Sequence, residues 1–168
     1  MRRLILFRHA KAEANSGRKD FDRPLTPRGR IDATLMARAA AERGLAPDVV
    51  LLSPSLRTRE TWDCARFAFL ETRVELRAGL YDATAEEIMA EVETVDGAPD
   101  SVMVIGHNPG LQEVAVNLLI DGGAPPSDVE RVSARFPTAT VADFLIDRKG
   151  RAALADLCHP RDIARGHE

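Results

Sequence analysis

Two arginines and two histidines stand where short apolar runs of this sequence end. They are Arg8 and His9 after the run 4–7, Arg57 shortly after the run 48–52, and His107 after the run 102–105. A guanidinium stays charged and offers paired donors to phosphate oxygens, and an imidazole can act as nucleophile or proton donor near neutral pH. A protein that transfers a phosphoryl group must balance about two negative charges and align a nucleophile with the leaving group. These four side chains therefore indicate phosphoryl-transfer chemistry, provided that the fold brings them together.

The elements that would position these residues follow from hydrophobic patterning. We expect a helix that Thr26 caps, that has Pro27 in its first turn and that ends at Gly44. Its apolar stripe is expected to consist of Ile31, Leu35, Met36 and Ala39. Thr84 and Glu87 predict a capping box for a later helix.

The remaining segments alternate between strand and helix patterns. We predict strands at 4–7, 48–52, 74–76, 102–105, 138–146 and 152–157, and further helices at 55–69, 84–95 and 109–120. Loops are expected at 10–24 and 121–126, a turn through Lys149 and Gly150, and a frayed tail in which His159 and His167 have no function. This alternation predicts an α/β fold: one domain over residues 1–168, three layers (α/β/α) and a mostly parallel central sheet. Because ligands bind outside the carboxyl ends of strands in such sheets, the turns that carry Arg8, Arg57 and His107 are expected to converge.

Four ordered motifs carry a family resemblance. The segment 6–13 around Arg8-His9-Ala10 resembles the Arg-His-Gly signature of the histidine phosphatase superfamily, which includes the phosphoglycerate mutases. The later motifs of that superfamily are similar to the segments 23–29, 53–61 and 106–109, and the match extends to about Ala139. Together these motifs resemble the SixA branch, the phosphohistidine phosphatases, more closely than the mutases.

The resemblance implies a phosphoglycerate mutase-like fold and a role for each motif residue. His9 would attack phosphorus and become a transient phosphohistidine, while Arg8, Arg57 and His107 would bind the phosphoryl oxygens. To attack, His9 must be neutral, so we expect its other ring nitrogen to donate to a backbone carbonyl. His107 is more useful protonated, and a phosphate dianion shared by the two histidines would help to enforce these opposite charge states. Arg23 is a further candidate for phosphate binding. No cofactor is implied, and the expected partner is a histidine-phosphorylated protein or a small phosphorylated substrate.

The sequence departs from the family pattern at two points. Ala10 replaces the usual glycine, so either the backbone there must adopt a conformation that alanine tolerates, or the phosphate must leave room for a methyl group. The carboxylic acid that protonates the leaving group in many relatives is not assigned; Asp82 is the nearest candidate and Glu13 another. A phosphohistidine leaves through an imidazole nitrogen and needs less help from an acid. Asn15 stands where some relatives have a phosphate-contacting asparagine.

Composition argues against several other classes of protein. The formal net charge of −3, without any block of like charge, does not favour nucleic-acid binding. The apolar run near the N-terminus is too short for a signal peptide or a membrane span, and Cys64 and Cys158 form no CxxC motif, so we expect a cytoplasmic protein with reduced thiols. The patterns of metal sites, of a P-loop and of cysteine-based phosphatases are missing. The oligomeric state stays open, with a monomer plausible.

Two alternatives to a phosphohistidine phosphatase stay open. The chain could be a phosphomonoesterase that acts on a small metabolite, or a phosphate-binding module that has lost turnover. The candidate loops are of modest length, which predicts a shallow, open site suited to a phosphate that another protein presents.

Overall fold

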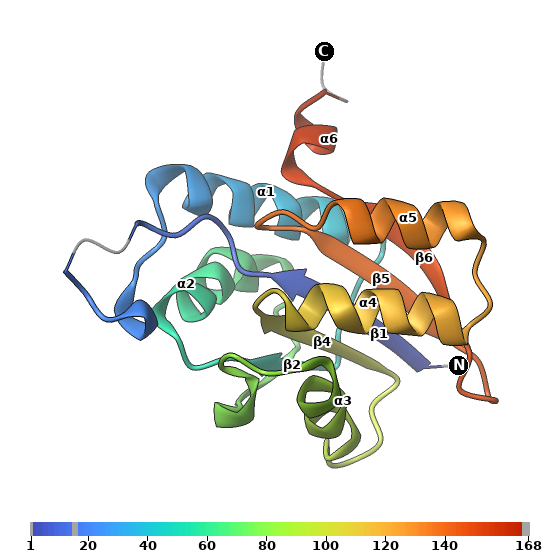
Figure 1. Ribbon diagram of the computed structural model, residues 1–168. Helices are drawn as coiled ribbons and strands as arrows, with labels where there is room; N and C mark the ends of the chain where they lie inside the picture. Colours follow the sequence, from blue (N-terminus) through green and yellow to red (C-terminus); the bar gives the residue numbers. More distant parts are fainter. Residues whose placement is uncertain (1, 15–16, 166–168) are drawn as a thin grey trace.

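A computed structural model of the protein describes residues 2–14 and 17–165. In this part of the chain, six strands form one sheet between two layers of helices (Figure 1). The strands are β1 (Arg2–Arg8), β2 (Val49–Leu52), β3 (Arg73–Leu76), β4 (Ser101–Gly106), β5 (Val141–Ile146) and β6 (Ala152–Cys158). Their order across the sheet is β3-β2-β4-β1-β5-β6. The strands β1 to β4 are parallel, whereas β5 runs antiparallel to β1 and β6 antiparallel to β5, which confirms a mostly parallel sheet.

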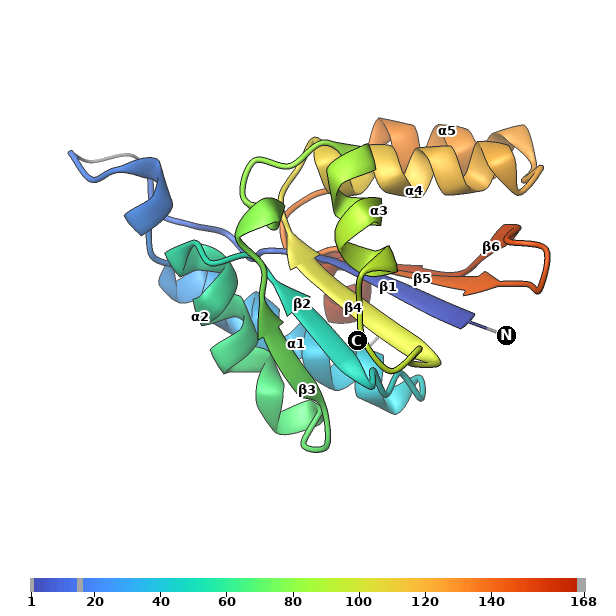
Figure 2. The same ribbon diagram turned by 90° about the horizontal axis from the view of Figure 1, so that it is seen from below.

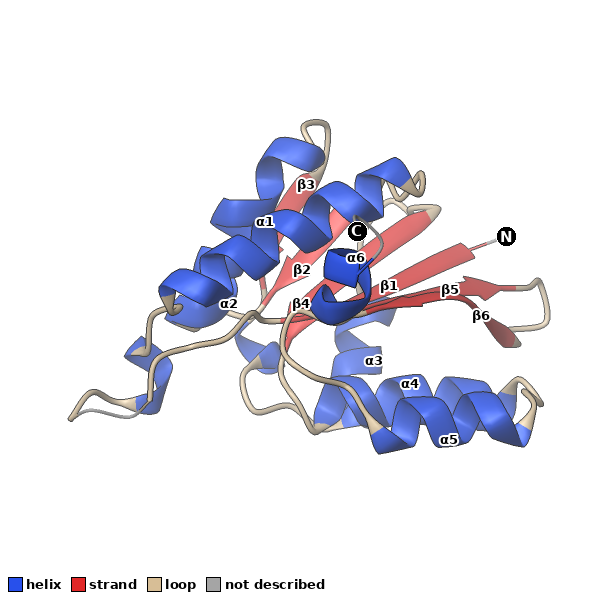
Figure 3. Ribbon diagram, turned by 90° about the horizontal axis from the view of Figure 1, so that it is seen from above, coloured by secondary structure: helices blue, strands red, loops and turns tan. Residues whose placement is uncertain are grey.

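The helices divide between the two faces of this sheet. They are α1 (Pro27–Glu42), α2 (Leu56–Ala65), α3 (Ala85–Glu93), α4 (Gly110–Asp121), α5 (Pro126–Ala134) and α6 (Pro160–Arg165). Figure 2 shows α1 and α2 on one side of the sheet and α3, α4 and α5 on the other, and Figure 3 shows the short α6 beside α1. None of the described helices has both the length and the apolar character that crossing a membrane requires.

Side chains of β1 show why its sequence is an uninterrupted apolar run. Leu4 and Leu6 belong to the core under α3 and α4, whereas Ile5 and Phe7 belong to the core under α1 and α2. A strand with helices on both faces needs apolar residues at every position. The predicted buried strands are confirmed for this reason.

Helix starts agree with the capping signals. The Thr26 hydroxyl accepts the N–H of Gly29 at 2.9 Å and begins α1, and Thr84 and Glu87 form the expected capping box of α3. Gly29 also lies directly against the backbone carbonyl of Lys11, so the first turn of α1 packs on the segment that follows β1. The predicted helix 55–69 is divided into α2 and a 3-10 turn, Arg66–Ala68.

The predicted apolar stripe of α1 is partly wrong. Ile31 is 61% exposed, and the face that packs on the sheet consists mainly of Ala33, Met36, Ala37 and Ala40. These positions have the i, i+3, i+4, i+7 spacing of a buried helix face. Alanine permits a close approach of the helix to the sheet. Because alanine is only weakly apolar, the prediction from sequence followed larger apolar residues such as Ile31 instead.

The C-terminal part contains more helix than predicted. The helix α5 begins at Pro126, in the segment expected to be a loop, because proline suits the first turn of a helix. The strand predicted from 138 begins at Val141, after Ala139 turns the chain with a φ of 60°. The tail forms α6 rather than fraying, and His159 before it is buried, with its Nδ1 2.9 Å from the Thr140 hydroxyl. This supports a structural role for His159; His167 lies outside the described residues.

Candidate active site

The three turns predicted to converge do so, because the strands that precede them are neighbours in the sheet. In the order β2-β4-β1, these strands end at Leu52, Gly106 and Arg8. The ring centroids of His9 and His107 lie 5.3 Å apart, and the N–H of His9 donates to the carbonyl of Gly106 at 3.0 Å. Arg57, in the first turn of α2, is buried at the same edge of the sheet.

His9 is oriented by the backbone of the next residue. Its Nδ1 lies 2.8 Å from the carbonyl oxygen of Ala10. A carbonyl can only accept, so Nδ1 carries the proton and the lone pair of Nε2 is left for chemistry. This is the contact expected from the sequence.

Ala10 is in turn fixed by α2. Its N–H donates to the Thr61 hydroxyl at 3.0 Å, and that hydroxyl donates to the carbonyl of Arg57 at 2.7 Å. Ala10 is fully buried and is not among the residues with positive φ, so alanine is accommodated without backbone strain. One threonine therefore links the turn that carries His9 to the helix that carries Arg57.

His107 is held between a serine and a tyrosine. The Ser53 hydroxyl lies 2.7 Å from its Nε2, and the Tyr81 ring meets the imidazole edge-on at 5.6 Å between centroids. The Nδ1 of His107 is buried and has no hydrogen-bond partner among the described residues. It is therefore available to a ligand.

Each of the two arginines keeps unused donors. Arg8 donates from Nη1 to the carbonyl of Phe136 at 2.7 Å. Arg57 donates from Nη1 to the Asp20 carbonyl at 2.7 Å and from Nη2 to the Asp20 carboxylate at 3.0 Å. The buried Nε atoms of both arginines have no partner in the part of the chain that the structure describes. A buried donor without a partner is costly, and an anion between these side chains would remove that cost.

Asp20 and Tyr81 complete the site, and the sequence did not single them out as site residues. The Asp20 carboxylate accepts from the Tyr81 hydroxyl at 2.8 Å as well as from Arg57 and Arg23. The hydrogen bond from Tyr81, with help from the two arginines, lowers the pKa of Asp20 to about 2. Asp20 is thus held ionised and is not a proton donor at neutral pH. Neither the residue type of Asp20 nor its spacing from Arg57 predicts this contact, because it forms only in the folded chain.

Both histidines are neutral at neutral pH. Burial is the main cause that lowers the pKa of His9 to about 3, with the positive charges of Arg57 and Arg8 adding to it. Burial, followed by Arg57, lowers the pKa of His107 to about 4. A neutral His9 is what nucleophilic attack requires. A protonated His107 stays a prediction for the phosphate-bound site, because a bound dianion would oppose the effect of burial.

The other predicted site residues lie at its margin. Arg23 donates to the Asp20 carboxylate, which Arg57 also contacts, and its Nη1 donates to the carbonyl of Glu13 at 2.8 Å. The Glu13 side chain is exposed. Asp82 is exposed too, with a φ of 53°, and forms no hydrogen bond or ion pair among the described residues. The roles of Arg23 and Asp82 stay predictions, and Asn15 lies outside the described residues.

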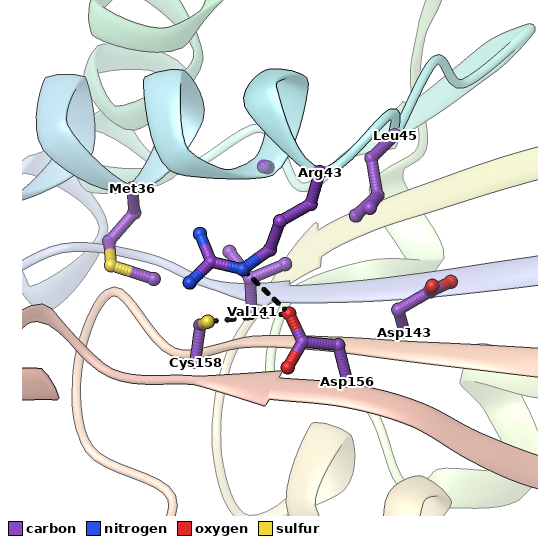
Figure 4. Close-up of a pocket in the computed structure, with 8 residues that line it drawn as sticks. Met36, Arg43, Leu45, Val141, Asp143, Asp156 and Cys158 are labelled. Atoms are coloured by element: carbon purple, nitrogen blue, oxygen red, sulfur yellow. Dashed lines mark hydrogen bonds and ion pairs between the residues drawn. The ribbon is translucent and has the colours of Figure 1, made fainter. Parts of the chain in front are cut away.

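Other parts of the described chain offer little for chemistry. Over residues 2–14 and 17–165, no three histidine, cysteine, aspartate or glutamate side chains gather as a metal site would require. Figure 4 shows a small pocket between α1, β5 and β6, lined by Met36, Arg43 and Cys158 among others. Its volume of about 10 Å³ suffices for no more than one water molecule. Cys64 and Cys158 are free thiols, and burial raises the pKa of Cys158 to about 11.

Comparisons with known proteins agree with this geometry. Residues 4–96 match the model of the histidine phosphatase superfamily (branch 1). A protein of Mycobacterium tuberculosis is 31% identical over 135 residues, which cover 80% of this chain and 84% of that protein.

Two solved structures are similar over nearly the whole chain. One, from Agrobacterium tumefaciens, is described as a putative phosphohistidine phosphatase SixA; it has a TM-score of 0.83 and 29% identity and covers 95% of this chain and 98% of its own. The other, from Nakamurella multipartitia, has the same description, with a TM-score of 0.82, 31% identity and coverage of 95% and 96%.

Proposed function

The chain belongs to the histidine phosphatase superfamily, on its SixA-like branch, and from this membership we propose that it hydrolyses phosphohistidine in proteins through a phosphorylated His9, without a metal ion. The observation that carries the proposal is a set of three buried polar atoms without partners among the described residues: Arg8 Nε, Arg57 Nε and His107 Nδ1. They come from three different elements at one edge of the sheet, beside a histidine with a free Nε2. Such a set is suited to a tetrahedral anion.

The first step is attack by His9. The lone pair of Nε2 forms a bond to phosphorus while the bond from phosphorus to the substrate imidazole nitrogen breaks, and the leaving nitrogen takes up a proton. Nδ1 keeps its proton and its contact with the Ala10 carbonyl at 2.8 Å, which holds the ring in position throughout. Attack of water on phosphorus then breaks the bond to Nε2, releases inorganic phosphate and restores neutral His9.

Charge balance changes when phosphate binds. Arg8 and Arg57 supply fixed positive charge, and a bound dianion opposes the burial that keeps the pKa of His107 at about 4. The Ser53 hydroxyl, 2.7 Å from Nε2 of His107, can donate to the neutral ring or accept from the protonated one. His107 can therefore gain a proton when phosphate binds and still keep its hydrogen bond with Ser53.

The carboxylates near the site favour a nitrogen-linked substrate. Asp20 is ionised by its partners, so it is not a ready acid for an alkoxide leaving group, and Asp82 forms no hydrogen bond with the site residues among the described residues. An imidazole is a better leaving group and is protonated near neutral pH.

An assay of two substrates in the presence of EDTA tests the proposal. The parent protein is expected to hydrolyse a phosphohistidine protein faster than an aryl phosphate, and EDTA is expected to leave both rates unchanged. His9→Asn keeps a donor for the Ala10 carbonyl but lacks the nucleophile, so it should lose activity on both substrates. His159→Asn is the matched control outside the site, since an asparagine can replace its contact with Thr140.

Each contrary outcome has a distinct meaning. Full activity of His9→Asn would exclude His9 as nucleophile. Hydrolysis of the aryl phosphate alone would favour a phosphomonoesterase, and hydrolysis of neither substrate would favour a phosphate-binding module. Loss of activity with EDTA would contradict the metal-independent mechanism.

A further inference from the structure

A second polar surface lies next to the candidate active site. A groove of about 730 Å³ is bordered by the segment after β1, the start of α1, the end of α5 with its following loop, and the start of α6. Figure 3 shows α6 lying beside α1. The charged side chains of this basic groove are Lys11, Arg28, Asp32, Arg135 and Arg161.

Charge in the basic groove is opposite to that of the whole chain. Four cationic side chains and one carboxylate give it a net charge of +3, against −3 for the protein. The carboxylate of Asp32 is occupied by Arg28, whose Nε lies 2.8 Å away. Lys11, Arg135 and Arg161 are exposed and, among the described residues, have no ion-pair partner. Three unpaired cations on one concave surface attract an anionic ligand.

The basic groove adjoins the phosphoryl site through one stretch of backbone. Pro137 and Thr138 line the groove, and the residues on either side of them contact the catalytic motif. The Phe136 carbonyl accepts from Arg8 at 2.7 Å, and the N–H of Ala139 donates to the His9 carbonyl at 3.0 Å. Lys11 stands two residues after His9. A chain whose phosphohistidine reaches His9 can therefore place its neighbouring residues over the groove.

We propose that the basic groove binds an acidic segment of the phosphorylated protein, next to the phosphohistidine that is hydrolysed. The inference rests on the proposed function and adds the surface that would select the phosphorylated protein. The groove is far larger than a single phosphoryl group, and its cations lie on four separate segments, as contact with an extended acidic chain requires. Electrostatic complementarity of this kind raises specificity and the rate of association.

Two synthetic phosphohistidine peptides of equal length test the proposal. One carries four glutamates beside the phosphohistidine and the other four glutamines, and an aryl phosphate serves as a substrate without any flanking chain. An exposed ion pair raises affinity about twofold, so three such pairs should give the acidic peptide roughly a tenfold higher kcat/KM, mainly through KM. The preference should shrink in concentrated salt, because exposed charges are screened.

Neutral variants identify the side chains responsible. The triple variant Lys11→Gln, Arg135→Gln, Arg161→Gln is expected to hydrolyse both peptides equally well and to keep its aryl phosphate kinetics within about twofold of the parent. Arg148→Gln is the control. Arg148 follows β5. Because the end of β5 pairs with the start of β1, Arg148 lies at the end of the sheet opposite to His9. This variant should retain the full preference for the acidic peptide.

The outcomes distinguish a failure of the groove proposal from a failure of the proposed function. If the parent hydrolyses both peptides at equal kcat/KM, the groove proposal is overturned while the proposed function stands. A preference that survives in the triple variant would overturn it as well. If neither peptide is hydrolysed while the aryl phosphate is, the proposed phosphohistidine activity fails, and the groove proposal fails with it.

Discussion

Thr61→Val removes a single hydroxyl from the site while nearly preserving the shape of the side chain. Thr61 is fully buried, and its hydroxyl accepts the N–H of Ala10 at 3.0 Å and donates to the Arg57 carbonyl at 2.7 Å. The Arg57 carbonyl keeps its helical partner when the hydroxyl is lost. The Ala10 N–H, however, is left buried without an acceptor.

The size of the effect follows from that orphaned donor. Leaving a buried N–H unsatisfied costs about 1–3 kcal/mol, so the free energy of unfolding should fall by that amount. The same peptide segment carries the Ala10 carbonyl that orients His9 at 2.8 Å. Because a displacement of about 1 Å at a reacting group costs about 10²-fold, we expect kcat to fall between about 10-fold and 100-fold, with less change in KM.

Urea unfolding and steady-state kinetics with an aryl phosphate measure the two effects. Thr34→Val is the matched control: this hydroxyl is only half-buried in α1 and donates to the Arg30 carbonyl at 3.0 Å. Its other partner, the Cys64 carbonyl at 3.4 Å, lies in the last turn of α2, whereas Arg57 lies in the first. The control should change neither stability nor kcat by much. Parent-like stability and kcat in Thr61→Val would refute the idea that α2 positions the nucleophile.

Three further changes test other parts of the account. Asp20→Ala removes the carboxylate that accepts from Arg57 at 3.0 Å, so kcat/KM for the aryl phosphate should fall about tenfold, or about 1.4 kcal/mol; unchanged kinetics would contradict this positioning role. Folded-state pKa values of about 3 for His9 and about 4 for His107 lie below the ordinary 6.5, so the unfolded chain binds more protons and stability should fall as pH drops from about 6.5 to 4. Urea unfolding should show a loss of up to about 1.4 kcal/mol per pH unit for each histidine, and a slope in His9→Asn as steep as in the parent would contradict it. Gly29→Ala should lower the melting temperature, because its Cβ would overlap the backbone that follows β1, and a parent-like melting temperature would show that this contact can relax.

The sequence predicted the parts of the fold that rest on local patterns. Strands buried on both faces must be apolar at every position, so β1, β2 and β4 stood out as short apolar runs. Once these strands were taken as parallel, the convergence of His9, Arg57 and His107 followed from the edge that parallel strands share. Thr26 and Thr84 marked helix starts because their hydroxyls satisfy donors within the first turn.

The rest depended on contacts between distant segments. Asp20 meets Arg57 across 37 positions and Tyr81 across 61, and no spacing rule anticipates such contacts. The packed face of α1 was misassigned because its alanines carry a weak apolar signal compared with Ile31, which is exposed.

Direct detection of the phosphorylated enzyme tests the central claim most closely. Mixing the protein with substrate and quenching in alkaline denaturant should trap one phosphoryl group, located by mass spectrometry in the peptide that contains His9. Magnetic resonance should place it on Nε2, since Nδ1 donates to the Ala10 carbonyl. His9→Asn should trap none. A phosphoryl group on another residue, or the same trapped phosphoryl group in His9→Asn, would contradict the account.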